Sequence, residues 1–417
     1  MARDLTDEGW ATLRFEAGEL FTPSLPIGAA ELFAGRRPQI NKLFDSIAER
    51  GRHAIVYGEP GVGKTSMAQI LRFIIPFKTK TVKFLRQPAF SQDTFFSIWQ
   101  RVFRDIHFTM NIGEGDLEYN LAQAYSSNIT PGDIVREMRS CFNDNDIPII
   151  VIDEYQKISD PTVSHDMAET VKALSDEGIN VTIIVVGVSD NVVDLVKGHE
   201  SIIRCSEEVL MPRMNKTELK EIVEQRIAKL GMKIEGNAKW KIINLSKGLP
   251  AFTHSLGKEA VLRTIDSRRL TVRETDVDHA IDSLVGSSQG TLKNDYEVAT
   301  RSNQERARYR QIITACAMAK SDENGYFVPK EVQAPLQAIL GKSVGIDGFN
   351  RNLREFTEPK RGAVLQDKGS ERLYRYRFKN PAMQPYVIMK GIQDGYLDER
   401  AKLALSSPEQ PDLFSTG

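Results

Sequence analysis

One glycine-rich segment of the chain carries residue types that could hold the phosphates of a nucleotide. It follows an apolar segment, precedes a helical pattern and matches the spacing GxxxxGK[ST]. Backbone N–H groups of such a loop can point at phosphate oxygens, and the N-terminus of the next helix adds partial positive charge. Lys64 is expected to contact the β- and γ-phosphates, and the Thr65 hydroxyl to ligate Mg²⁺. The predicted nucleotide-binding residues of this loop are Gly58, Glu59, Pro60, Gly61, Val62, Gly63, Lys64, Thr65 and Ser66.

Two acidic residues follow a second apolar segment, at residues 147–152. An acidic side chain at the carboxyl end of a buried parallel strand faces the crevice in which ligands bind. Asp153 is expected to ligate Mg²⁺ directly or through a water molecule, and Glu154 is expected to orient and deprotonate the attacking water. A strand followed by a charged turn is the alternative interpretation, but the glycine-rich loop upstream favours the catalytic one.

The composition indicates a globular chain with more than one domain. Its 417 residues exceed what one hydrophobic core usually serves, and 41% apolar with 27% charged residues is ordinary for folded proteins. Three scattered cysteines, Cys141, Cys205 and Cys316, form no CxxC pair, which disfavours a disulfide framework or a zinc site. No apolar run approaches the roughly 18 residues that span a bilayer, and the N-terminal segment is too acidic for a signal peptide. We therefore expect a cytoplasmic protein without a membrane partner.

Strand and helix patterns alternate in the first half of the chain, which predicts a doubly wound α/β sheet. Short apolar segments typical of strands buried on both faces lie at residues 53–58, 81–85, 147–152 and 181–188. Residues 1–30 are expected to be an extended lead-in, because Pro23 and Pro26 break any helix. After Pro212 the pattern becomes helical throughout. The predicted domains are an N-terminal extension at 1–30, an α/β nucleotide-binding domain at 31–212, an all-α domain at 213–288, a winged-helix domain at 296–390 and a tail at 391–417.

The C-terminal part of the chain is basic and has a pattern of its own. Residues 301–390 carry 17 Lys and Arg against 9 Asp and Glu, so their net charge is +8 and the remainder carries −9. The winged-helix plan of this part predicts helices at 310–319, 330–340 and 346–356, a short strand at 326–328, and hairpin strands at 362–365 and 373–378. Basic residues expected to contact DNA lie on the third helix and the hairpin: Arg351, Arg354, Lys368, Arg372, Arg375 and Arg377. The alternative is a winged helix that contacts protein, with its aromatic residues filling a core.

The order of these features resembles the AAA+ superfamily, and within it the initiator group related to the origin-recognition-complex ATPases. Residues 32–36 (LFAGR), before an amphipathic helix, are similar to the family's adenine-side box. Residues 185–191 are similar to its sensor-1 strand, and residues 271–284 to the closing helix of its α-helical lid. The resemblance covers about residues 30–390 and implies further nucleotide-contacting or sensor residues, namely Phe33, Gly35, Arg36, Ser189 and Asp190.

The resemblance also implies a homo-oligomer with active sites between subunits. Arg204, after the sensor strand, is the expected arginine finger that reaches a neighbour's ATP, and Arg213 is the second candidate. The lid lacks the usual sensor-2 arginine, and we interpret the nearest residue, His254, as a packed lid histidine. Gly248-Leu249-Pro250 resembles the lid motif of the STAND signalling ATPases, which implies a nucleotide contact by Pro250.

These features predict an ATPase that binds ATP or ADP with Mg²⁺ and hydrolyses ATP to ADP and phosphate. The metal residues predicted are Thr65 and Asp153, and the catalytic residues are Lys64, Glu154, Ser189, Asp190 and Arg204. The first functional hypothesis is a self-assembling AAA+ protein that binds duplex DNA through its winged helix. The alternative is a STAND-like nucleotide switch, or an accessory ATPase of a defence system, whose winged helix contacts an effector protein.

Overall fold

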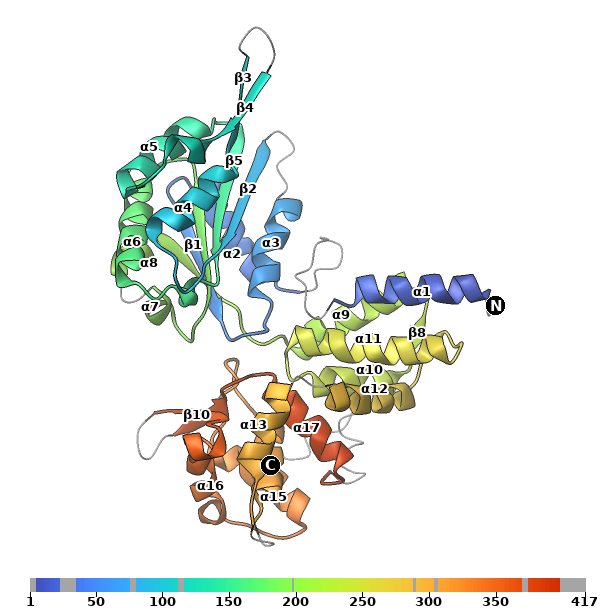
Figure 1. Ribbon diagram of the computed structural model, residues 1–417. Helices are drawn as coiled ribbons and strands as arrows, with labels where there is room; N and C mark the ends of the chain where they lie inside the picture. The colour runs from blue at the N-terminus through green and yellow to red at the C-terminus, as the bar shows by residue number, and fades with distance from the viewer. Residues whose placement is uncertain are drawn as a thin grey trace. The chain divides into compact units, whose positions relative to one another are not determined.

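The computed structural model describes residues 5–22, 35–75, 80–111, 116–196, 199–287, 290–303, 307–369 and 374–397. The chain forms two units (Figure 1). The helical unit comprises Met1–Leu25, Pro60–Val62 and Pro212–Gly417, and the sheet unit comprises Pro26–Glu59 and Gly63–Met211. Within the described ranges, no helix is long and apolar enough to cross a membrane.

The sheet unit is built on a parallel five-stranded sheet in the order β2-β5-β6-β1-β7. Along β6, Ile183 and Val185 join one apolar cluster with Trp99, whereas the alternating Ile184 and Val186 are buried on the opposite face. Both faces of the sheet are therefore covered, which confirms the predicted doubly wound α/β class. The strands are β1 (His53–Gly58), β2 (Thr81–Pro88), β5 (Asp146–Asp153), β6 (Thr182–Val188) and β7 (Ser206–Leu210).

The register of the sheet brings the ends of four strands to one edge. Gly58 of β1 is paired with Val188 of β6, and Pro88 of β2 with Asp153 of β5. The segments that follow these strands therefore begin side by side, as ligand-binding loops do in open parallel sheets. The edge strand β7 was not predicted, because its sequence SEEVL is short and polar.

Helices flank the sheet (Figure 1). In α4, Phe95, Trp99 and Phe103 recur at a spacing of four residues and are all buried, while a reciprocal pair of hydrogen bonds between Thr94 and Ser97 caps the first turn. The helices of this unit are α2 (Arg37–Ala48), α3 (Lys64–Ile74), α4 (Phe95–Arg104), α5 (Pro131–Cys141), α6 (Pro161–Asp176), α7 (Val192–Leu195) and α8 (Glu200–Arg204), with short 3₁₀ turns η2 (Leu121–Ala124) and η3 (Tyr155–Lys157).

An antiparallel hairpin of β3 (His107–Asn111) and β4 (Asp116–Asn120) projects from the sheet unit (Figure 1). It was not predicted from the sequence. Phe108 and Tyr119 lie opposite each other and stack with their ring centroids 5.4 Å apart. Such cross-strand aromatic pairs stabilise a hairpin outside the main sheet.

The lid, defined here as α9 to α12, belongs to the helical unit and follows the sheet unit in sequence. Its bounds are α9 (Lys216–Lys229), α10 (Gly236–Leu245), α11 (Pro250–Asp266) and α12 (Glu274–Ser287), with a two-residue parallel pairing of β8 (Lys233–Ile234) and β9 (Thr271–Val272). The polar residues 286–294, whose composition predicts a linker, include the end of α12 and the start of α13.

The C-terminal module, defined here as residues 290–397, contains α13 (Gly290–Thr300), α14 (Tyr309–Met318), α15 (Pro329–Leu340), η4 (Ile346–Gly348), α16 (Asn350–Glu355), η5 (Pro359–Arg361), β10 (Leu365–Lys368), β11 (Arg375–Phe378) and α17 (Met383–Gln393). The predicted third helix is divided between η4 and α16. The first hairpin strand starts at Leu365 rather than at residue 362, because Gly362 and Ala363 have left-handed backbone (φ 74° and 45°) that cannot continue a strand. Of the expected strand at 326–328, only Phe327 pairs, as an isolated bridge to Tyr376.

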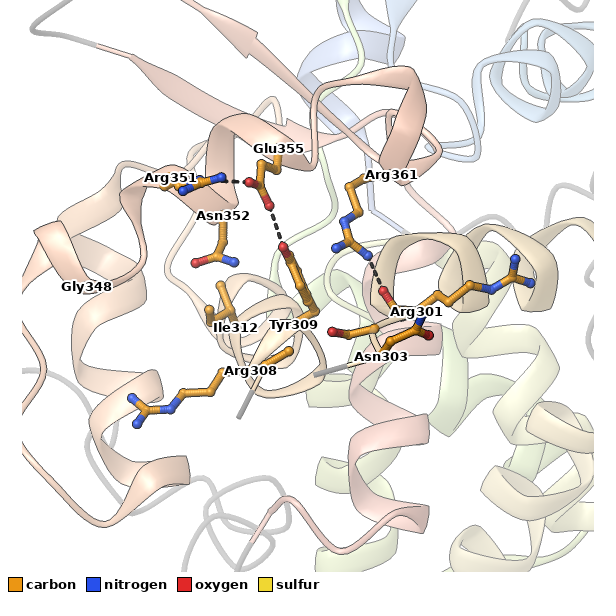
Figure 2. Close-up of a pocket in the computed structure, with 12 residues that line it drawn as sticks. Arg301, Asn303, Arg308, Tyr309, Ile312, Gly348, Arg351, Asn352, Glu355 and Arg361 are labelled. Atoms are coloured by element: carbon orange, nitrogen blue, oxygen red, sulfur yellow. Dashed lines mark hydrogen bonds and ion pairs between the residues drawn. The ribbon is translucent and has the colours of Figure 1, made fainter. Parts of the chain in front are cut away.

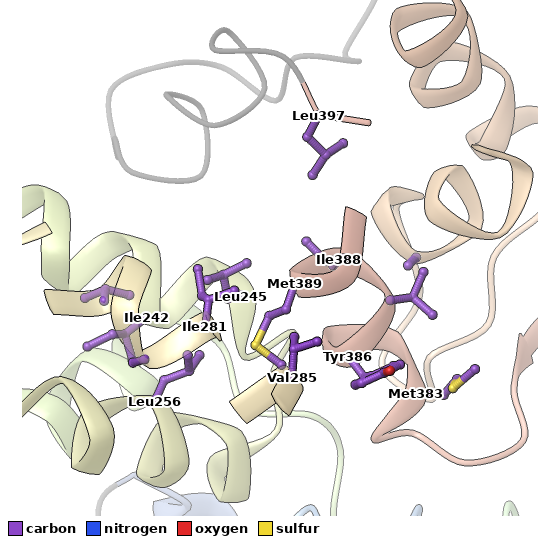
Figure 3. Close-up of a cluster of buried hydrophobic side chains, with 14 of the residues drawn as sticks. Ile242, Leu245, Leu256, Ile281, Val285, Met383, Tyr386, Ile388, Met389 and Leu397 are labelled. Carbon is purple, nitrogen blue, oxygen red and sulfur yellow. The ribbon is translucent and has the colours of Figure 1, made fainter. Parts of the chain in front are cut away.

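The lid and the C-terminal module share one apolar core. Helix α17 packs against α12, and Met389 and Tyr386 of α17 belong to the same buried cluster as Ile281 and Val285 of α12 (Figure 3). All four side chains are at most 7% exposed. The two parts therefore form one packed body.

The N-terminal segment is helical rather than extended, which corrects the expectation from the sequence. Helix α1 (Asp7–Leu20) is capped by the Thr6 side chain, and Leu13, Ala17 and Phe21 at a spacing of four residues are buried. The helix ends before Pro23, so the prolines limit its length without preventing it.

Phe21 joins α1 to the lid helix α11. A Cβ on Gly257 would lie 2.5 Å from the Phe21 ring, so only glycine leaves room for it. The Thr22 N–H donates to Nδ1 of His254 over 3.2 Å, and the Phe21 ring meets the imidazole edge-on. Burial, assisted by the charge of Arg226, lowers the pKa of His254 from 6.5 to about 3. His254 is therefore a neutral, packed side chain.

The depressed pKa of His254 makes the stability of the helical unit dependent on pH. Protons bind this imidazole more readily in the unfolded chain than in the folded one. The free energy of unfolding of the helical unit therefore falls as the pH drops through 6.5 toward 3. Between about pH 7.5 and about pH 5, the parent should lose about 2 kcal/mol more free energy of unfolding than His254→Gln does. Urea titrations at both pH values measure the difference, and equal losses in the two proteins would contradict it.

Candidate nucleotide-binding site

The glycine-rich loop leaves β1 at a glycine whose surroundings exclude a side chain. Gly58 has φ 148°, and a Cβ there would lie 2.4 Å from the carbonyl oxygen of Met211. The Met211 N–H donates to the carbonyl of the preceding Tyr57, so the contact is fixed by strand pairing. Gly63 caps α3 in left-handed backbone (φ 95°) and directs the chain into the helix. Steric constraints therefore explain why residues 58 and 63 of the motif are glycines.

Lys64 opens α3 and turns its side chain back into the loop. Its Nζ donates to the carbonyl oxygens of Gly58 (3.0 Å) and Glu59 (2.7 Å), and the residue is 8% exposed. Burial lowers the pKa of Lys64 to about 8, against the opposing effect of the carboxylates of Glu154, Asp153 and Glu59. The Lys64 ammonium therefore lies close enough to Asp153 and Glu154 to interact with their charges, although these residues are about 90 positions away in sequence.

Asp153 ends β5, is 1% exposed and accepts hydrogen bonds at both oxygens. Its Oδ1 accepts from Thr65 Oγ1 (3.4 Å) and from the Glu154 N–H (2.9 Å). Its Oδ2 accepts from Nε (3.1 Å) and Nη2 (2.5 Å) of Arg86. A hydroxyl beside a carboxylate is a donor set that suits Mg²⁺, which prefers oxygen ligands.

Arg86 was not predicted as a site residue. It lies on β2, whose register places it next to Val151 of β5, and its side chain reaches the end of that strand. The only signal in the sequence that could have indicated Arg86 was its charge, directly after a segment expected to be a buried strand. The sheet order, which makes β2 the neighbour of β5, was needed to find its partner.

Glu154 begins the 3₁₀ turn η3 with left-handed backbone (φ 57°, ψ 34°), which is uncommon for a residue with a side chain. Its Oε2 accepts from Nε2 of Gln156 (2.9 Å) and lies 3.4 Å from Nζ of Lys157. Gln156 in turn accepts at Oε1 from the N–H of Val188 (2.8 Å). Sequence reasoning missed Gln156 as well.

The predicted sensor residues Ser189 and Asp190 follow β6 directly and are half-buried. The Asn191 N–H donates to Ser189 Oγ over 3.4 Å. Gly35 and Arg36 precede α2 with left-handed backbone (φ 66° and 60°), and Arg36 is 1% exposed. Phe33 lies outside the described residues, and Ser66 lies in the first turn of α3.

The two arginine-finger candidates have different surroundings. The Arg204 side chain is 80% exposed at the end of α8 and has a 3.6 Å ion pair with Glu200. Arg213 belongs to the helical unit, where its Nη1 donates to the Lys247 carbonyl (3.3 Å) and to Gln384 Oε1 (2.5 Å). Pro250, also in the helical unit, is the buried first residue of α11.

The residues predicted to contact DNA lie on α16 and the hairpin, except Arg372, which is outside the described residues. Arg354 and Lys368 are exposed, and Arg351 pairs with Glu355 over 2.9 Å. Aromatic and basic residues alternate along residues 373–378, which predicts the arginines on one strand face and the aromatics on the other. In β11, Tyr376 and Phe378 are buried, whereas Arg375 and Arg377 are not. Arg375 lies 3.4 Å from Asp322, and Arg377 lies over the Tyr326 ring at 4.6 Å.

A polar cavity of about 770 Å³ opens between the start of α14 and α16 (Figure 2). Glu355 accepts there from the Tyr309 hydroxyl (2.6 Å) as well as from Arg351, while the Arg361 guanidinium lies 3.7 Å above the Tyr309 ring. The arginines that line the cavity are Arg301, Arg308, Arg351 and Arg361. The sequence did not predict this convergence, because the arginines come from separate turns and helices.

A parallel sheet that carries a loop of the GxxxxGK[ST] pattern after β1 and paired acids after β5 defines the P-loop NTPase class, as the sequence predicted. A family model described as novel STAND NTPase 1 matches residues 27–313. This match spans more than half of the chain, and the chain belongs to that family. No curated protein matches the chain.

Solved structures of ORC and Cdc6 proteins are among those similar to this chain. The ORC2 protein of Aeropyrum pernix, in ADPNP and ADP complexes, is 15% identical; the match covers 90% of this chain and 98% of that chain with a TM-score of 0.50. Cdc6p from Pyrobaculum aerophilum is 13% identical, with 91% and 99% covered and a TM-score of 0.48. The A. pernix ORC1 protein in complex with DNA is 15% identical, with 90% and 96% covered and a TM-score of 0.48. At such identity the likeness concerns the fold.

We expect Arg86→Met to destabilise the sheet unit, because it leaves the buried Asp153 carboxylate without its cationic partner. The expected loss in the free energy of unfolding is about 2–4 kcal/mol, measured by urea titration. Arg50→Met is the matched control, since its ion pair with Asp144 is exposed (58% and 85%) and should contribute less than about 1 kcal/mol. Removing both charges in Arg86→Met/Asp153→Asn should recover part of the loss, and an unchanged stability of Arg86→Met would refute the pairing.

Proposed function

We propose that the protein hydrolyses ATP at the carboxyl edge of its sheet, with Glu154 as the general base. The observation that carries the proposal is the convergence of Lys64, Thr65, Asp153 and Glu154 from two segments of the chain. The combination of a buried ammonium, a hydroxyl and two carboxylates suits phosphoryl transfer to water, in which positioning and charge stabilisation do most of the catalysis.

Each group has a role that follows from its surroundings. The N–H groups of the loop and the Lys64 ammonium hold the phosphates, and Glu154 accepts the proton of the attacking water. Mg²⁺ would be held by Thr65 and Asp153, where it supplies charge neutralisation of the phosphate oxygens. Arg86 occupies Oδ2 of Asp153, so Oδ1 remains directed toward Thr65. Ser189 and Asp190 serve as sensors at the end of β6.

We further propose that active sites are completed between copies of the chain. Arg204 is the preferred arginine finger, because its exposed side chain can extend to a neighbour, whereas Arg213 is bonded within its own helical unit. The remaining contacts with the nucleotide are assigned to Phe33, Gly35, Arg36 and the lid residue Pro250.

Glu154→Gln should retain binding of Mg·ATP while its hydrolysis rate falls about 100-fold or more, because the amide cannot accept the proton of water. Isothermal calorimetry measures the affinity, and phosphate release measures turnover. Glu169→Gln, an exposed change of the same kind on α6, is the control and should behave as the parent does.

Two other results of this experiment decide parts of the proposal. Turnover by Glu154→Gln at the parental rate would remove Glu154 from the role of base. Arg204→Ala, assayed in parallel, should lose hydrolysis and keep nucleotide binding, and unchanged turnover would remove the arginine finger.

We also propose that the C-terminal module binds duplex DNA. Support comes from its net charge of +8 over residues 301–390, from the exposed Arg354 and Lys368, and from the arginine-lined cavity next to α16. Lysine and arginine at such positions neutralise phosphates and give affinity with little sequence reading.

Arg354→Ala/Lys368→Ala should weaken binding to a duplex of any sequence and reduce the slope of log affinity against log salt by about 2. Fluorescence anisotropy over a salt series measures both quantities. Lys216→Ala, an exposed lysine at the start of α9, is the control and should leave the slope unchanged. If the affinity of the parent protein for the duplex does not change with salt, the result would argue against DNA binding by the module.

The second candidate function is a STAND-like nucleotide switch, or an accessory ATPase of a defence system, whose C-terminal module contacts an effector protein. Membership of the novel STAND NTPase 1 family favours it. Tightly bound ADP that co-purifies, with no response of hydrolysis or particle size to duplex DNA, would support this candidate. Assembly with a slowly hydrolysed ATP analogue that is enhanced by DNA would support the first.

A further inference from the structure

We propose that Gln156 is a positioning residue that couples the catalytic carboxylate of Glu154 to the end of strand β6, so that hydrolysis depends on the state of the sensor segment. The inference rests on the proposed ATPase function and adds a means of regulating the same site. It starts from one side chain whose two polar atoms join two parts of the site that are about 30 residues apart in sequence.

The orientation of the Gln156 amide follows from its partners. The N–H of Val188 can only donate, so the amide oxygen must face it, at 2.8 Å. The amide nitrogen then faces Glu154 Oε2, at 2.9 Å, and donates to it. A reversed amide would place its nitrogen against an N–H and its oxygen against a carboxylate, and would lose both bonds.

The end of β6 is shaped to admit this side chain. A Cβ on Gly187 would lie 2.9 Å from the Gln156 amide oxygen and 2.4 Å from a methyl carbon of Leu195. Glycine at this position therefore leaves the space that the amide occupies. The bridge is half-buried, and its amide oxygen is packed against Gly187.

In the part of the chain that the structure describes, little else fixes the Glu154 carboxylate. The side chain is 38% exposed, and its other partner, Lys157, is 52% exposed at 3.4 Å, a type of ion pair that contributes little. The hydrogen bond from Gln156 is accordingly the contact best placed to orient the carboxylate. Catalytic groups need such support, since small errors of placement reduce the rate strongly.

The coupling follows from where the bridge is anchored. Val188 is the last residue of β6 and is followed directly by Ser189 and Asp190, the proposed sensors of the terminal phosphate. A shift of this segment moves the Val188 N–H, and the amide carries the shift to Glu154. The base is then aligned when the sensor segment is in place.

Gln156→Glu tests the coupling with almost no change of shape. At about pH 8, a second carboxylate faces Glu154 where a donor stood, and like charges at this distance repel. We expect kcat to fall about 10- to 100-fold, as for other lost supporting hydrogen bonds, while KM and the affinity for Mg·ADP change less than about twofold.

Gln123→Glu is the matched control, because it makes the same change of charge at an exposed position of the sheet unit. It should keep the parental kcat and pH profile. If Gln156→Glu does not fold, judged by circular dichroism, Gln156→Met provides the test: it removes both hydrogen bonds without a charge, so kcat should fall by a similar factor at every pH with KM unchanged.

The outcomes separate this inference from the proposed function. If Glu154→Gln abolishes hydrolysis but neither Gln156 variant reduces it, the inference is overturned. The proposed ATPase function would then still stand. A loss of kcat in Gln156→Glu that comes with an equal loss of nucleotide affinity would also overturn the inference. A parent that binds no nucleotide, by contrast, would overturn the proposed function itself.

Discussion

The arrangement of the site depends on the ionised carboxylate of Asp153, which is buried at the end of a strand. Moving such a group out of water costs several kcal/mol unless charges and hydrogen bonds compensate. The compensation comes from Arg86 of β2, from the backbone of Glu154 and from Thr65 of α3. One acidic side chain thus ties the phosphate loop, the edge strand and the turn that carries the proposed base. The order β2-β5-β6-β1 is what brings these partners within reach.

The parts of this site that the sequence predicted are those encoded locally. The glycine-rich loop and the Asp153-Glu154 pair each lie within one segment, next to an apolar strand with an unmistakable pattern. Arg86 and Gln156 could not be found in that way, because their roles depend on which strands are neighbours. Helix α1 was missed for a related reason. Two prolines suggested extended backbone, whereas the buried face of the helix is apparent only once the lid it packs on is known.

The C-terminal module shows the same division between local and distant information. Alternation of aromatic and basic residues along β11 was readable from the sequence, since a strand exposes every second side chain. The start of β10 was misplaced because left-handed backbone at Ala363 is set by tertiary context. The cavity beside Tyr309 gathers arginines from several turns of chain, and its pairing of Arg351 with Glu355 occupies a side chain expected to face DNA.

The common core of α12 and α17 has a mechanical meaning. A lid that is joined to the next module by a flexible tether could swing while the module stayed behind. Here Met389 and Val285 belong to one buried cluster, so independent rotation of the two would first have to expose that apolar surface to water. A change in the orientation of α9 to α12 would therefore be expected to move the C-terminal module with it.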